Sequence, residues 1–236
     1  MKFIFLATLL LFFDQPLGLF SKLKSRQLVV VKTSGWNSIN GKLTTYKWEN
    51  NQWLPVLKSI PIVTGRNGLA WGKGLQDGSF NKGKLKKEGD GNAPAGIFYL
   101  SGLFGYNDIS AKMKSLKVDN NTFCVDDVKS AYYNQIVKQD TVKKDWSSAE
   151  TMRMKTDIYK YGIFVDYNVN SPIAGKGSCI FMHIWSKSTS PTAGCTAMTE
   201  DNILKLIGFL DKSKNPVLVQ VPQSEYPRLK QLYKLP

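Results

Sequence analysis

The sequence predicts a mainly β domain, built as a sandwich or an open barrel, with a few short helices. Short β-branched and aromatic runs recur along the chain, turn residues separate them, and helical periodicity is clear only near the C terminus. The 236 residues are 42% hydrophobic and 21% charged, which is ordinary for a globular chain able to bury a full core. We expect one domain over residues 26–221 and a C-terminal helical segment over residues 222–236.

The N-terminal half supplies the first strands. Residues 26–33 (RQLVVVKT) are a β-branched run, and residues 41–56 alternate around Glu49-Asn50-Asn51, which indicates a hairpin. Residues 59–78 begin as a strand and continue as a glycine-rich loop, and another short strand follows at residues 97–100. The polar stretch from 107 to 155 is expected to be a loop-rich insertion with short helical turns.

The C-terminal half adds strands at residues 161–168, 178–185 and 215–222. Residues 199–211 (TEDNILKLIGFLD) form the clearest helix, because apolar residues recur at helical spacing. Thr199 is a good N-cap, and Glu200 and Asp201 suit the positive end of the helix dipole. Residues 224–235 are expected to form a terminal helical segment.

Residues 1–21 have the features of a signal peptide. Lys2 precedes an apolar stretch over residues 3–13, and residues 14–16 (DQP) then break the helix. The stretch is short for a membrane span, so we expect export to the periplasm or cell wall. The sequence PLGLFS lacks a small-x-small cleavage pattern, so an uncleaved signal anchor is the alternative.

The formal net charge of +14 indicates an anionic environment, which nucleic acid, a membrane surface or an acidic wall polymer could each provide. The lysines are scattered and no nucleic-acid-binding motif accompanies them, so we expect no nucleic acid partner. In an oxidising compartment, three cysteines suggest one disulfide and one free thiol. Three small buried hydrophobic residues are the alternative.

The only histidine of the chain, His183, lies twelve residues before Cys195. Strand alternation places His183 on one face with Cys179, Phe181 and Trp185. Cys195 ends the turn SPTAGC, where Gly194 permits a bend that exposes amide N–H groups to an oxyanion. A histidine on a neighbouring strand could take the thiol proton. The alternative is a packed core histidine beside an incidental thiol.

The surrounding sequence resembles the YkuD-type L,D-transpeptidase family. HIWSKSTSPTAGCTAM is similar to its histidine–spacer–[Ser/Thr]-x-Gly-Cys signature. GRNGLAWGKG, KKEGDGNAPAGIFYL, CVDD, DWSSAETM, YGIFVDYN and GSCIFMHIW resemble, in matching order, the blocks of one branch of the family. The resemblance extends over residues 28–219 and implies a mixed β-sandwich or open-barrel catalytic fold.

The resemblance also implies acyl transfer on peptidoglycan stem peptides, by a protein peripheral to the cell wall. Cys195 would be the nucleophile and His183 its base, while Gly194 would support the oxyanion. Trp185 could contact substrate, since it shares a strand face with His183. No cofactor or metal is expected, and no feature of the chain sets its oligomeric state.

The residues after the cysteine depart from the family pattern. Many family members carry Arg or Asn soon after the cysteine, whereas Thr196-Ala197-Met198 follow here. An L,D-carboxypeptidase or other wall hydrolase using the same thioester step is therefore the alternative, and a non-catalytic module that binds anionic wall polymer is a third. With Cys195 catalytic, Cys124 and Cys179 become the candidate disulfide, against two separate buried thiols.

Overall fold

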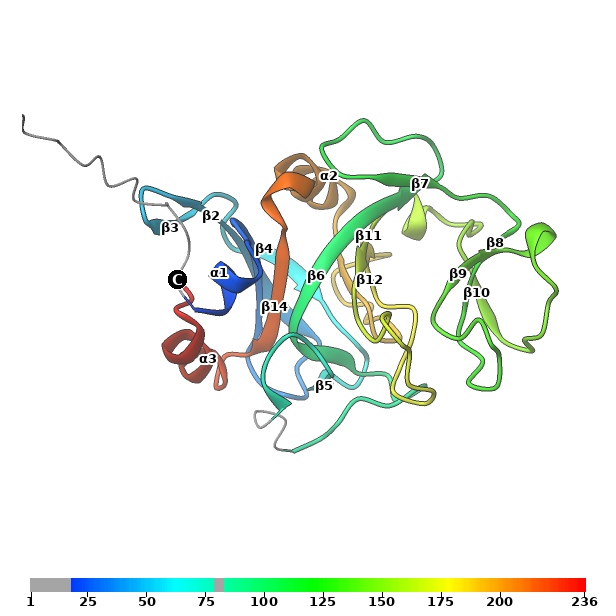
Figure 1. The fold of residues 1–236 in the computed structure, drawn as a ribbon, viewed down its shortest axis with the longest axis horizontal. Helices are drawn as coiled ribbons and strands as arrows, with labels where there is room; N and C mark the ends of the chain where they lie inside the picture. Colours follow the sequence, from blue (N-terminus) through cyan, green and yellow to red (C-terminus); the bar gives the residue numbers. More distant parts are fainter. Residues whose placement is uncertain (1–17, 79–82) are drawn as a thin grey trace, which may run out of the picture.

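The computed structural model describes residues 18–78 and 83–236, which form a strongly curved sheet with short helices around it (Figure 1). β1 pairs with β14 on one side and with β2 on the other, which closes eight of the described strands into a ring. In ring order they are β1 (Gln27–Thr33), β14 (Val217–Pro222), β6 (Ala93–Gly105), β11 (Tyr161–Val165), β12 (Phe181–Ile184), β13 (Thr196–Met198), β4 (Ile60–Val63) and β2 (Asn40–Glu49). The predicted mainly β, barrel-like fold class is confirmed.

Three short strands extend this sheet. β3 (Gln52–Pro55) forms the expected hairpin with β2, while β5 (Leu69–Trp71) and β7 (Ser115–Lys117) pair with β6. Asn50 and Asn51 at the hairpin turn have φ angles of 52° and 59°. Asparagine tolerates this left-handed region, which a two-residue turn with matching strand twist requires.

Strands β1 and β14 are buried on both faces, which explains their continuous apolar sequences. One face, with Val29 and Leu218, joins a core that also contains α2 (Glu200–Phe209). The other face, with Val30 and Val219, joins a second core that contains α3 (Tyr226–Tyr233). The sheet is therefore the middle layer between two hydrophobic cores.

Helix α2 occupies most of the predicted range of 199–211, and the Thr199 side chain accepts a hydrogen bond from the Asn202 N–H, as expected of an N-cap. A short 3-10 turn, η4 (Lys212–Lys214), then leads into β14. Helix α3 lies within the C-terminal segment for which helix is predicted.

The insertion between β7 and β11 is more ordered than the sequence indicates. It contains a second sheet of β10 (Ala149–Thr151), β8 (Thr122–Val125) and β9 (Ile136–Lys138), with the 3-10 turns η2 (Gln139–Thr141) and η3 (Asp157–Tyr159). Figure 1 places this sheet at the end of the molecule opposite α1 and α3. Strands of three or four residues are too short to give a period-2 signal, so the sequence indicated loops.

The predicted signal segment extends to residue 21, and its residues 1–17 lie outside the described part of the chain. Residues Leu19–Lys22 form the short helix α1, and Phe20 is fully buried in the core around α3. The Phe20 ring packs edge-on against Trp53, with 5.9 Å between centroids. None of the described helices is long and apolar enough to cross a membrane.

Because Phe20 is part of this core, we expect Phe20→Ala to lower the free energy of unfolding by about 3 kcal/mol, as for other buried phenylalanines. Urea denaturation followed by circular dichroism measures the change. Leu204→Ala, at a side chain that is 40% exposed, is the matched control and should change stability by about 0.5 kcal/mol or less. Equal stabilities of wild type and Phe20→Ala would mean that the segment is not packed as described.

Candidate active site

The predicted pair lies on two adjacent parallel strands. β12 carries His183, Cys195 immediately precedes β13, and the register pairs Met182 with Thr196 and His183 with Ala197. Cys195 therefore lies beside Phe181, whose N–H donates to the Cys195 Sγ at 3.3 Å. His183 lies two residues further along β12, on the same face as Phe181. The structure thus brings Cys195 and His183 to one face of the sheet.

The loop before Cys195 is fixed at several points. The Thr192 hydroxyl donates to the Cys195 carbonyl at 2.6 Å and accepts from the Gly194 N–H at 3.1 Å. A Cβ at Gly194 would lie 3.1 Å from the Asn92 carbonyl oxygen and 3.4 Å from the Ile180 side chain. Glycine therefore permits a close backbone approach here, and its predicted support of an oxyanion stays a prediction.

Cys195 and His183 are each only 6% exposed, and this burial sets their protonation. Burial lowers the pKa of His183 to about 4, because the charged imidazolium is poorly solvated. Burial, followed by the charge of Glu150, raises the pKa of the Cys195 thiol. At neutral pH the site therefore holds a neutral thiol and a neutral imidazole.

A backbone carbonyl selects the tautomer of the histidine. The His183 Nδ1 lies 2.8 Å from the Ile184 carbonyl oxygen, which can only accept a hydrogen bond. The neutral ring therefore carries its proton on Nδ1 and leaves the Nε2 lone pair available. This is the state that a general base requires.

Two clefts adjoin the Cys195 thiol. The histidine cleft, of about 210 Å³, is lined by His183, Trp185, Tyr159 and the loop that ends at Cys195. The carboxylate cleft, of about 140 Å³, is lined by charged residues, namely Arg66, Lys86, Glu88, Asp126 and Glu150. Trp185, a predicted substrate contact, thus lies in the same cleft as His183. Cys195 and Glu150 line both clefts.

Tyr159 and Glu150 belong to this site, and the sequence did not identify them. Tyr159, on η3, is buried with its ring centroid 5.1 Å from that of His183, and its hydroxyl interacts with the Cys195 thiol. The same hydroxyl donates to the Glu150 carboxylate at 2.8 Å. The two residues come from different elements of the insertion, so no local motif connects them to Cys195.

The model of the YkuD family, described as the L,D-transpeptidase catalytic domain, matches residues 27–219. The chain belongs to this family. A solved structure of the helical cell shape determining protein Pgp2 from Campylobacter jejuni is similar at 14% identity and a TM-score of 0.43. That likeness covers 84% of this chain and 48% of Pgp2, so the chain spans about half of the Pgp2 length. No curated protein matches the sequence significantly.

In this L,D-transpeptidase domain a disulfide joins the insertion to the sheet that carries His183. Cys124 on β8 is bonded to Cys179, which lies just before β12, 55 residues further along the chain. Cys195 is the free cysteine, and its thiol lies 3.5 Å from the Cys179 carbonyl oxygen. The disulfide therefore holds the insertion, with Glu150, next to Cys195.

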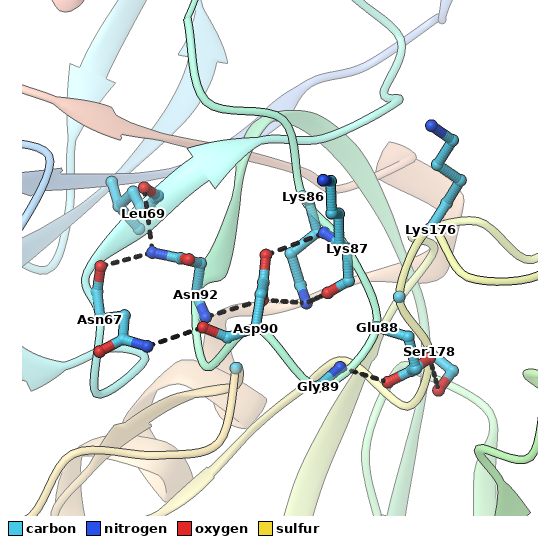
Figure 2. A network of polar contacts seen from close by, with 12 residues as sticks. Asn67, Leu69, Lys86, Lys87, Glu88, Gly89, Asp90, Asn92, Lys176 and Ser178 are labelled. Atoms are coloured by element: carbon cyan, nitrogen blue, oxygen red, sulfur yellow. Dashed lines mark hydrogen bonds and ion pairs between the residues drawn. The ribbon is translucent and has the colours of Figure 1, made fainter.

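The loop between β5 and β6 contributes Lys86, Glu88 and Gly89 to the lining of the carboxylate cleft. Figure 2 shows the polar contacts of this loop. The Lys86 ammonium pairs with Asp90 at 2.7 Å, and the two side chains are only 4% and 14% exposed. Glu88 accepts a hydrogen bond from the Ser178 hydroxyl at 2.6 Å, next to the disulfide (Figure 2). Residues 88–92 (EGDGN) thus hold charged side chains beside Cys195.

We expect Asp90→Ala to lower the free energy of unfolding of the L,D-transpeptidase domain by about 3 kcal/mol, because it leaves the buried Lys86 ammonium unpaired. Chemical denaturation at neutral pH measures the loss. Glu49→Ala is the matched control, since it breaks a pair with Lys47 in which both side chains are about half exposed. Similar effects of the two variants would contradict the structural role of the Lys86–Asp90 pair.

Proposed function

We propose that this chain is an L,D-transpeptidase of peptidoglycan stem peptides, with Cys195 as nucleophile and His183 as general base. The observation that carries the proposal is the parallel register of β12 and β13, which puts an available imidazole nitrogen and the free thiol on one face. Family membership supplies the substrate class, and the local geometry supports the roles of the two residues.

In the first half-reaction, the Cys195 sulfur attacks the carbonyl before the terminal D-alanine as its proton passes to His183 Nε2. The bond to D-alanine then breaks, and His183 returns the proton to the departing amine, which leaves a thioester on Cys195. Because both groups start neutral, proton transfer accompanies attack and no thiolate–imidazolium pair is required beforehand. The Cys195 N–H would donate a hydrogen bond to the oxyanion, and Gly194 would permit the turn that exposes this N–H.

In the second half-reaction, an amine of another stem attacks the thioester carbonyl, which re-forms the thiol and creates the cross-link. Water attacking instead would give an L,D-carboxypeptidase. One observation favours this alternative. Ala197, two residues after Cys195 and on the same strand face, has no polar side chain that could bind the acceptor amine. The high net charge of +14 suits an exported protein peripheral to an anionic wall.

Incubation of the full chain with tetrapeptide muropeptides, followed by mass spectrometry, tests the proposal. We expect dimeric products, together with a carbapenem adduct on Cys195 in intact-mass measurements. Cys195→Ala should abolish both, and His183→Ala should slow turnover by about 10²- to 10⁴-fold, the usual contribution of a general base. Tripeptide monomers alone would establish hydrolysis, and an unmodified Cys195 in a folded protein would refute the nucleophile assignment.

The pH dependence provides a separate test. Since burial lowers the pKa of His183 to about 4, the imidazole stays neutral at all pH values above this and can accept a proton. We therefore expect the acid limb of kcat/KM to lie near pH 4, with circular dichroism used to verify that the protein remains folded. An acid limb near the ordinary histidine pKa of about 6.5 would contradict the buried, neutral imidazole.

A further inference from the structure

Two hydrogen-bond donors other than His183 lie beside the Cys195 sulfur, and only one of them can change its hydrogen bonding. The Phe181 N–H always donates to the sulfur, at 3.3 Å. The Tyr159 hydroxyl interacts with the thiol and also with Glu150, but it carries a single proton. It can therefore donate to the sulfur or to the carboxylate, but not to both at once.

The protonation of Glu150 decides which of these bonds forms. An ionised carboxylate only accepts, so the Tyr159 hydroxyl donates to Glu150 at 2.8 Å and the thiol is left with the Cys179 carbonyl as its acceptor, at 3.5 Å. A protonated Glu150 can instead donate to the Tyr159 oxygen, which frees the tyrosine proton for the sulfur. Hydrogen bonds to a charged acceptor are the strong ones, so the second arrangement stabilises a developing thiolate.

We propose that Tyr159, coupled to Glu150, is a positioning residue that directs a hydrogen bond to the Cys195 sulfur when Glu150 is protonated. This inference rests on the proposed role of Cys195 as nucleophile. Through Tyr159 and Glu150, the insertion between β7 and β11 helps to control the reactivity of the Cys195 thiol.

The groups around Glu150 bring the pKa of its carboxyl close to physiological pH. Burial, together with the nearby charges of Asp126 and Glu88, raises the pKa of Glu150 to about 7, although the Tyr159 hydrogen bond opposes the shift. Near the thiol, Lys86 lowers the pKa of Cys195, while ionised Glu150 raises it. His183, with a pKa of about 4, does not change its charge near neutrality. Glu150 is therefore a group beside Cys195 whose ionisation falls close to pH 7.

Alkylation of Cys195 by iodoacetamide tests the inference without peptidoglycan. Cys124 and Cys179 form the disulfide, so intact mass should register one adduct. For the wild type, the rate should rise with pH, flatten near pH 7 as Glu150 ionises, and then rise again. In Glu150→Gln the flattening should disappear, and alkylation above pH 8 should be about ten-fold faster than in the wild type, which corresponds to one pKa unit.

Tyr159→Phe should slow alkylation at pH 6 by about ten- to a hundred-fold, the factor expected for one hydrogen bond to a charged group. The difference in alkylation rate between Tyr159→Phe and the wild type should narrow above pH 8, because there the wild-type Tyr159 hydroxyl donates to Glu150. Tyr226→Phe is the matched control: this buried tyrosine also donates its hydroxyl to a backbone carbonyl, that of Pro236, but it belongs to the core around α3. It should follow the wild type at every pH.

A Tyr159→Phe effect of equal size at every pH, or flattening that persists in Glu150→Gln, would overturn the inference. If Tyr159→Phe fails to fold, the Glu150→Gln profile decides the question alone. The expected pH profiles together with no muropeptide turnover would refute the proposed function only. Turnover of muropeptides without these profiles would refute this inference only.

Discussion

Strands β12 and β13 run parallel, and their register determines where the Cys195 thiol lies. Pairing of His183 with Ala197 brings the residue just before β13 beside Phe181, so that the Cys195 sulfur accepts the Phe181 N–H. A shift by one residue would turn Cys195 to the opposite face of the sheet, into the core that contains Met182. The loop before Cys195, the helix after β13 and the closure of the barrel all maintain this register.

Burial of the pair has a chemical consequence. A solvated thiol and imidazole could form an ion pair, but here desolvation raises the pKa of Cys195 and lowers that of His183. The Cys195 thiol therefore stays protonated at neutral pH. Such a thiol reacts less readily with other electrophiles, which suits a protein expected to be exported to an oxidising compartment.

The insertion between β7 and β11 contributes residues to the site from outside the barrel. It contributes Glu150 and Tyr159, and the disulfide from Cys124 to Cys179 attaches it beside the strand that carries His183. On the other side, the loop with the Lys86–Asp90 pair forms the wall of the carboxylate cleft. The thiol is thus surrounded by three separate segments: the strand of His183, the insertion with Glu150 and the loop with Lys86.

The sequence by itself determined the mainly β class, the β2–β3 hairpin and the Thr199-capped helix, because these depend on local alternation, turn residues and capping. It also predicted Cys195 and His183 as a pair, because the sequence around them resembles the signature of the family. Only the tertiary structure decided the short strands of the insertion, the contact of Tyr159 and Glu150 with the thiol, and the neutral state of the pair. These features depend on burial and on pairing between distant segments, which no local pattern specifies.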